Sequence, residues 1–261
     1  MTINLSNGTI ITSEQDGILT IRFDRPEKKN ALNRAMYSAL ADELERADRT
    51  DSIRVILLTG SQDCFSSGND LADFIMAPPE GTDSPVFRFL TAISTARKPL
   101  VAAVNGTAVG VGVTMLLHCD LVYAAAGATF QMPFVSLGLC PEAGSTLLLP
   151  RMMGHQRAAE LLLMGESFGA GTAREVGIVN QVCKDGELMA IARAKAEQLA
   201  AQPAASVRLA KALLKRDYGA ELQETIAEEG RLFLDRLGSP EAAEALKAFM
   251  EKRKPDFSRF S

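Results

Sequence analysis

The sequence predicts an α/β core followed by an extension made of helices alone, and three observations support this fold class. Two stretches of alternating apolar residues, 8–12 and 17–23, are separated by a polar turn ending in Gly17 and predict a β-hairpin. A continuous apolar run at 53–59 predicts a strand buried on both faces. From Leu188 onward the chain is rich in Ala, Leu, Lys and Glu, which predicts helices.

The first helix is expected after a polar loop at 25–30. Asn33 is expected to cap this helix, which runs to about Arg49. Its apolar residues recur at helical spacing and define one face: Ala35, Met36, Leu40 and Leu44. Residues 60–70 follow the buried strand and are expected to form a loop, and a second helix begins at 71–75.

The rest of the core is expected to alternate between short strands and helices. Residues 78–85 are rich in Pro, Gly and acids and indicate a mobile surface segment. The remaining elements predicted here are a helix at 87–96, strands at 121–124 and 129–130, and helices at 154–164 and 173–176. In the helical extension, breaks are expected at Pro203, Gly219 and 238–240.

Length and composition indicate a soluble globular enzyme. A chain of 261 residues can form one large domain with an appendage, and we expect a core at 1–195 and a helical region at 196–261. The hydrophobic content of 47% and charged content of 23% are ordinary for such a protein. The net charge of -4 shows no excess of basic residues of the kind that nucleic-acid-binding proteins carry.

Cysteine, histidine and terminal sequences point to the cytoplasm and away from a metal site. The N terminus is polar and carries no visible signal peptide, and the chain ends in Arg259-Phe260-Ser261 rather than in Ser-Lys-Leu. The 4 cysteines are widely spaced, as in an intracellular protein with reduced thiols. With only 2 histidines and no Cys/His cluster, we expect no bound metal.

The most informative stretch is glycine-rich and runs from Asn105 to Leu117. It follows an apolar strand at 99–104, and Gly110 and Gly112 are expected to open a helix. Glycines let a ligand approach the backbone, and the first turn of a helix offers unpaired N–H groups to a negative charge. The Asn105-Gly106 break argues against a membrane span. No phosphate-loop or dinucleotide fingerprint is present, so alone the stretch fits a structural turn equally well.

Four motifs in the same order resemble the crotonase superfamily, which includes enoyl-CoA hydratases and isomerases. They are FSSGNDL, PLVAAVNGTAVGVG, A-x-E-x-G-I-V at 173–179 and FMEKRKPDF near the C terminus. The resemblance spans nearly the whole chain. It implies a spiral of ββα turns with a C-terminal helical trimerisation region, a homotrimer or dimer of trimers, and an acyl-CoA thioester as substrate. It implies no cofactor beyond the coenzyme A moiety.

In this superfamily two backbone amides bind the thioester oxygen, and the motifs place them at Asn69 and Val111. Val111 stands where the family often has glycine, which leaves the amide in place and narrows the site. The positions assigned to coenzyme A by the resemblance are Arg25, Lys28, Lys29, Ala31, Ser66, Ser67, Gly68, Asp70, Leu71 and Gly110. Lys252, Arg253 and Lys254 are expected near phosphates, contributed by a neighbouring subunit.

The carboxylates favour isomerisation over hydration. The family's hydratases use two glutamates, and the corresponding positions here hold Thr114 and Phe134, neither of which is a useful proton carrier. Residues 134–145 and the FSSGNDLADF segment resemble the peroxisomal-type Δ3,Δ2-enoyl-CoA isomerases, in which one glutamate is the base. That residue is Glu142, and we expect its pKa to be raised by apolar neighbours, among them Phe134, Leu137 and Leu139.

Other interpretations stay open. Without the motif, Glu142 would be read as a surface carboxylate at a helix start. A related ring-opening isomerase branch has an aspartate at this position. The chain could also be a hydratase of an unusual thioester, or a catalytically idle protein that binds acyl-CoA. Cys140, His118 and Asp120 are expected to be structural.

Overall fold

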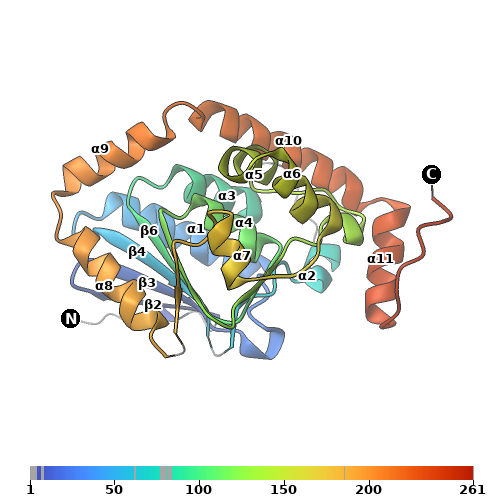
Figure 1. The fold of residues 1–261 in the computed structure, drawn as a ribbon, viewed down its shortest axis with the longest axis horizontal. Coiled ribbons are helices and arrows are strands. Elements are labelled where there is room, and N and C mark those ends of the chain that lie inside the picture. Colours follow the sequence, from blue (N-terminus) through green and yellow to red (C-terminus); the bar gives the residue numbers. More distant parts are fainter. Residues whose placement is uncertain are drawn as a thin grey trace.

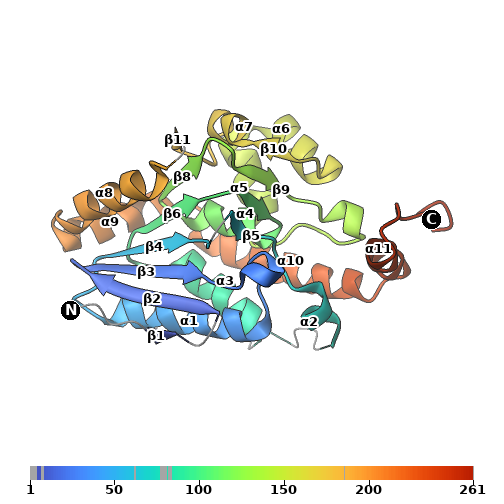
Figure 2. The ribbon, with the colours of Figure 1, turned by 90° about the horizontal axis from the view of Figure 1, so that it is seen from below.

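The structure is a computed structural model that describes residues 5–6, 9–61, 63–76, 81, 84–184 and 186–260. Its strands form two sheets. The first sheet has seven strands in the spatial order β1 (Leu5–Ser6), β2 (Ile10–Gln15), β3 (Ile18–Phe23), β4 (Val55–Thr59), β6 (Leu100–Val104), β8 (Leu121–Ala125) and β11 (Gln181–Cys183) (Figure 2). The second has four strands in the order β10 (Phe168–Gly169), β9 (Thr129–Gln131), β7 (Thr107–Val109) and β5 (Cys64–Ser66).

The chain winds as a spiral between these sheets. Strands β4, β6 and β8 enter the first sheet, and the strands that follow each of them, β5, β7 and β9, enter the second. Pairing within this part of both sheets is parallel. The carboxyl ends of β5 and β7 therefore meet at one edge. This arrangement is the spiral of ββα turns implied by the resemblance.

Helices cover both faces of the first sheet and then extend beyond it. Their bounds are α1 (Arg34–Arg49), α2 (Leu71–Met76), α3 (Pro85–Thr95), α4 (Val111–Thr114), α5 (Ser145–Met153), α6 (His155–Ala159), α7 (Ala170–Glu175), α8 (Leu188–Ala200), α9 (Ala204–Lys215), α10 (Gly219–Leu237) and α11 (Pro240–Met250). Shorter 3-10 helices occur at Pro26–Lys28, Met115–His118 and Val135–Leu137, and a π-helical turn at Glu160–Met164.

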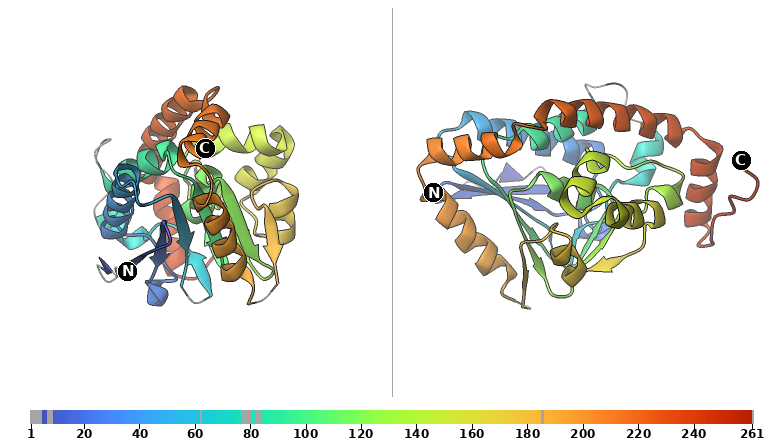
Figure 3. Two further views of the ribbon diagram at one scale, coloured as in Figure 1. Left: turned by 90° about the vertical axis from the view of Figure 1, so that its left-hand side faces the viewer. Right: turned by 45° about the horizontal axis from the view of Figure 1, so that its top comes forward.

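The central strands β4 and β6 of the first sheet are buried on both faces, as the continuous apolar run predicts for β4. Ile56 and Leu58 of β4 belong to the main core with α1 and α3, whereas Val55 and Leu57 pack with α8. The expected boundary after residue 195 thus falls inside a helix that packs against the sheet. Helices α9 and α10 run across the top of the molecule, and α11 lies at its end (Figures 1 and 3).

Several expected elements are confirmed. The hairpin forms β2 and β3, and Asp16 and Gly17 take positive φ in its turn. Asn33 caps α1 by accepting a hydrogen bond from the N–H of Met36, but Ala35 is exposed, so its assignment to the apolar face is wrong. The breaks among the C-terminal helices also lie where they are expected.

Several elements are additional to the expected ones, among them the short strands β1, β10 and β11. Strands β5 and β7 occupy segments interpreted as loop and turn, and α5 begins directly after the motif that contains Glu142. Most of the predicted mobile segment at 78–85 lies outside the described residues. Within the described part of the chain, no helix combines the length and apolar character needed to cross a membrane.

Candidate active site

Two backbone N–H groups lie without a hydrogen-bond acceptor at the shared edge of β5 and β7. Leu32 forms a parallel bridge with Asn69 by bonding to Gly68 and Asp70, so the N–H of Asn69 points away from Leu32. The N–H of Val111 is the first of helix α4. Among the described residues neither group has an acceptor. They are therefore available to a ligand oxygen.

Glycines bring these two amides together. A Cβ atom on Gly68, whose φ is +89°, would lie 2.8 Å from the carbonyl oxygen of Val109. A Cβ atom on Gly112 would lie 2.7 Å from the carbonyl oxygen of Ser66. Real Cβ atoms do not approach an oxygen so closely, so only glycine permits the two loops to pack at this distance.

Glu142 lines a small cavity of about 20 Å³ together with Asn69. Its side chain is only 7% exposed, and the other lining residues are Phe74, Val86, Phe87, Leu90, Gly230, Phe233 and Leu234. Burial raises the pKa of Glu142 to about 8. The raised pKa of Glu142 agrees with the sequence-based expectation. The apolar side chains that line this cavity differ from the expected ones, because they belong to α2, α3 and α10. Leu137 and Leu139 line an adjoining, larger cavity instead.

Two buried hydroxyl groups interact with the residues of this site, one with Glu142 and one with Asn69. The hydroxyl of Thr114 in α4 donates a hydrogen bond to Oε1 of Glu142, which lowers the pKa of the acid against the effect of burial. Tyr37 of α1 is fully buried and donates to Oδ1 of Asn69. Burial raises the pKa of Tyr37 well above its usual value, and the charge of Glu142 adds to this shift. Tyr37 thus holds the side chain of Asn69 and senses the charge of Glu142.

The backbone after Glu142 is held by His118. Its Nε2 lies 2.8 Å from the carbonyl oxygen of Ala143. Burial lowers the pKa of His118 to about 3, so the ring is neutral and Nε2 carries the donated proton. Ala143 has φ of +61°, an uncommon value for a residue with a side chain. His118 thus has the structural role expected of it, as does Asp120, which accepts from the N–H of Leu100.

A second buried carboxylate, Glu229 of α10, holds the same loop from the other side. It accepts from the N–H of Gly144 at 2.5 Å, and from the N–H and hydroxyl of Thr146 at 2.9 and 2.5 Å. Burial raises the pKa of Glu229, and its charge in turn raises that of Glu142. Sequence reasoning missed Glu229. The available signal was an acid on the apolar stripe formed by Leu222, Ile226 and Phe233.

Apart from Gly110, which precedes α4, the residues predicted to bind coenzyme A lie in two segments that bond to each other. Nη1 of Arg25 donates to Oδ2 of Asp70 at 2.7 Å and to the carbonyl oxygen of Ala31 at 3.0 Å. Ser66 is buried and donates to the carbonyl oxygen of Asn30. These residues therefore pack one loop on the other, and the exposed cations here are Lys28 and Lys29. Coenzyme A binding by these residues stays a prediction.

The two positions of the hydratase glutamates also lie here. Cε1 of Phe134 would lie 3.9 Å from a Cβ atom on Gly110, so its ring faces the glycine turn.

Cys140 is half-buried, and burial raises the pKa of its thiol to about 11. Arg253 of the C-terminal motif is paired with Glu244 and Glu251. The described residues contain no cluster of His, Cys, Asp or Glu able to hold a metal ion.

Comparison with known proteins finds relatives that match nearly the whole chain. The family model described as Enoyl-CoA hydratase/isomerase matches residues 13–259. Human enoyl-CoA delta isomerase 2 is 35% identical over 252 residues, which are 94% of this chain and 64% of that relative's length. The 2,3-dehydroadipyl-CoA hydratase of Escherichia coli (strain K12) is 34% identical over 252 residues, covering 95% of this chain and 98% of the relative.

A solved structure is similar throughout its length. The enoyl-CoA hydratase/isomerase from Pseudoalteromonas atlantica T6c has a TM-score of 0.91 and 46% sequence identity, covering 95% of this chain and 99% of that one. These relatives include an isomerase and a hydratase by name. The type of reaction must therefore be argued from the side chains.

The carboxyl group of Glu142 should titrate near pH 8, far above its ordinary value. Replacing Thr114 by Val should move the midpoint up, because it removes a hydrogen bond to the carboxylate. Glu229→Gln should move it down, because it removes a negative charge; each shift should be about one unit. Infrared difference spectra between the wild type and Glu142→Gln, recorded against pH, report this group alone. Thr114→Ser is the control that keeps the hydroxyl, and an unshifted midpoint in both test variants would contradict this assignment.

Proposed function

The chain belongs to the enoyl-CoA hydratase/isomerase family, and from this premise we propose that it moves a double bond from C3 to C2 of an enoyl-CoA. One observation carries the proposal. Among the described residues that line the small cavity, Glu142 is the only acid, and it faces a site with two free amides nearby. A shuttled proton needs one carboxylate, whereas the addition of water normally needs more.

In the proposed reaction, ionised Glu142 takes a proton from C2 of the substrate. The electron pair of the broken C–H bond delocalises over the thioester and the C3–C4 double bond to give a dienolate. The N–H groups of Asn69 and Val111 donate to its oxygen. Glu142 then returns the proton to C4, which leaves the double bond between C2 and C3. Each amide of such a pair typically contributes about 10²–10³ in rate.

Hydration is the less supported reaction because Phe134 occupies the place of the second glutamate. Thr114, at the first place, is fully buried and already donates its proton to Glu142. Neither side chain can activate water as a base. Glu229, the other buried carboxylate described nearby, is occupied by the three donors of the loop that it holds.

Coenzyme A binding and self-association complete the proposal. Lys28 and Lys29 are exposed beside the loop of Asn69, in reach of phosphates approaching that edge. On α9, Leu209, Leu213 and Leu214 are 62, 54 and 78% exposed. We infer that this patch of large apolar side chains is buried against further copies of the chain, in a homotrimer or dimer of trimers.

The reaction itself can be tested with trans-3-hexenoyl-CoA. We expect conjugated product by ultraviolet absorbance, with no oxygen taken up from labelled water, and no hydration of crotonyl-CoA. Glu142→Gln should lower kcat at least about 10²-fold because the base is lost. Binding of saturated hexanoyl-CoA to this variant should be unchanged. Hydration of crotonyl-CoA by the wild type would indicate the hydratase, and absence of turnover across a thioester panel would indicate an idle binding protein.

The amide pair can be tested with Gly112→Ala. The added methyl group must move the β5 loop because Ser66 lies in its way. We expect kcat to fall at least about tenfold, since the amides no longer converge on one oxygen. Gly171→Ala on α7 is the matched control, because nothing lies within 4 Å of its Cβ position. Equal activity of the two variants would argue against the role of the amide pair.

Self-association can be tested at the α9 patch. Sedimentation should show a trimer or hexamer for the wild type. The double substitution Leu213→Glu and Leu214→Glu should give smaller species, because charges then replace the exposed leucines. A wild-type monomer, or a variant that assembles normally, would place the interface elsewhere.

A further inference from the structure

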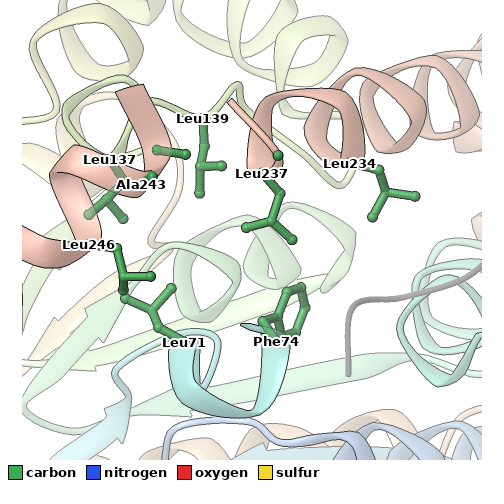
Figure 4. A pocket seen from close by; sticks show the side chains of 10 residues that line it. Leu71, Phe74, Leu137, Leu139, Leu234, Leu237, Ala243 and Leu246 are labelled. Carbon is green, nitrogen blue, oxygen red and sulfur yellow. The ribbon is translucent and has the colours of Figure 1, made fainter. Parts of the chain in front are cut away.

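The larger cavity beside the site of Glu142 is lined by apolar residues alone within the described part of the chain (Figure 4). Another cavity has a different character. It lies where α9 turns into α10 at the top of the molecule, beside the end of α3 (Figure 1), and its volume is about 590 Å³. We call it the α9 cavity. The described residues that line it include four cations and no acid: Arg97, Arg208, Lys211 and Lys215.

The positive charge of the α9 cavity is only partly balanced. Lys211 is buried and pairs with Asp120, with 2.7 Å between Nζ and Oδ2. Lys215, one turn further along α9, donates to the backbone carbonyl oxygen of Ser94 at 3.3 Å. Arg208 is exposed. Among the described residues, neither Lys215 nor Arg208 forms an ion pair with a carboxylate, so two cations of the cavity lack a counter-charge.

The ionisation of nearby groups responds to this excess charge. Burial lowers the pKa of Lys215 to about 8; the charge of Lys211 contributes to the shift, whereas Asp120 and Cys119 oppose it. Burial also lowers the pKa of His118, and the charge of Lys215 is the next largest cause. A bound anion would offset the repulsion between the two ammonium groups of α9.

The cations are arranged along one side of α9. Arg208, Lys211 and Lys215 are spaced by three and four residues, which places them on the same face of the helix. Gly219, at the start of α10, also lines the cavity, and this 19-residue helix begins without a side-chain cap. Its first turn therefore adds backbone N–H donors and the positive end of a helix dipole to the cations of α9.

The rest of the lining is largely apolar, with side chains from Ala96, Leu209, Ala212 and Leu222. Leu222 is buried and also packs against the loop of Glu142, since a Cβ atom on Gly144 would lie 2.3 Å from its Cδ1. The side chain of Leu222 thus separates the α9 cavity from that loop, and the two sites are distinct. The volume of the cavity exceeds that of a phosphate ion, which leaves room for an organic group beside the cations.

We propose that the α9 cavity binds an organic phosphate, with the phosphate group between Arg208 and Lys215 and the organic part against Leu209 and Leu222. A phosphate monoester has about two negative charges at neutral pH and three acceptor oxygens, which match the two unbalanced cations. The Leu213 and Leu214 positions tested for self-association do not line the cavity, so assembly through them is compatible with binding. The inference does not depend on the proposed reaction.

Calorimetric titration of the assembled wild type at neutral pH tests the site with two probes, inorganic phosphate and phenyl phosphate. Phenyl phosphate should bind at one site per chain, and at least about fivefold more tightly than inorganic phosphate, because its ring leaves water for the apolar part of the cavity. Phenol, which has the ring without the phosphate, should not compete. Absence of binding, or equal affinity for the two phosphates, would overturn the inference.

Substitutions of two arginines locate the binding site. Arg208→Gln should weaken binding of phenyl phosphate at least about tenfold, and Arg208→Lys should restore part of the loss, because a charge-assisted hydrogen bond to phosphate is removed and then replaced. Arg216→Gln is the matched control, since Arg216 is exposed directly after α9 and does not line the cavity. Phenyl phosphate should raise the melting temperature of the wild type and the control but not of Arg208→Gln. An equal effect of both glutamine variants would indicate diffuse attraction and would overturn the site.

Two further variants exclude other locations. The double substitution Lys28→Gln and Lys29→Gln, in the loop predicted to bind coenzyme A, should leave binding of phenyl phosphate unchanged. Loss of binding in this variant, with normal binding in Arg208→Gln, would assign the phosphate to that loop. Binding that appears only when Leu213→Glu and Leu214→Glu dissociate the assembly would mean that another copy of the chain covers the cavity. Either result contradicts the proposal, and neither depends on which reaction the protein catalyses.

Discussion

The close packing of two strand ends is the constraint on which the site depends. Strands β5 and β7 are parallel neighbours, so the loops that follow them leave the sheet at the same edge. The backbone of each loop then lies where a side chain of the other would be, which is why glycine occupies both Gly68 and Gly112. The loops cannot approach and also satisfy every backbone donor. The N–H groups of Asn69 and Val111 are left over, and they are the groups that the proposed chemistry needs.

A buried acid beside these amides requires a supporting structure of its own. An ionised carboxylate loses much of its hydration in an apolar pocket. Its pKa therefore rises, unless hydrogen bonds stabilise the charged form. Thr114 stabilises the charged form of Glu142 directly, whereas Glu229 and His118 act on the backbone that carries it. Ala143 takes an unfavourable left-handed conformation that costs about 1 kcal/mol. Bonds from two sides hold that turn, so the acid has little freedom to turn outward.

The sequence allowed much of this architecture to be predicted, because its strongest signals are local. The apolar run of β4, the cap at Asn33 and the breaks between the C-terminal helices each depend on nearby residues. Strands β5 and β7 have three residues each, too few for periodicity, so they could not be recognised without their partners in the sheet. The ordered family motifs, rather than any pattern of spacing, identified Glu142 and the two amides as candidates.

Long-range contacts set the limits of such prediction. Tyr37 and Glu229 lie far from Glu142 in sequence, and only folding brings α1 and α10 to opposite sides of the site. A polar residue on an apolar helix face was the visible sign in both cases. The sequence predicts Leu137 and Leu139 as neighbours of the acid. In the structure, the 3-10 turn Val135–Leu137 and the residues after it direct these two side chains into the adjoining cavity. Side-chain direction depends on this turn, and sequence separation does not report it.

The balance of effects on the pKa of Glu142 bears on how one carboxylate could carry out the proposed isomerisation. A group that first accepts and then returns the same proton must be accessible in both states, and it works best when its pKa lies near the working pH. An exposed glutamate, with a pKa of about 4.3, would accept a proton readily only in acid and would be a weak base at neutral pH. Burial and the charge of Glu229 raise the pKa, the hydroxyl of Thr114 lowers it, and the result is about 8. At that value both protonation states are populated near neutral pH, so in the proposed reaction Glu142 would serve as base and acid in turn.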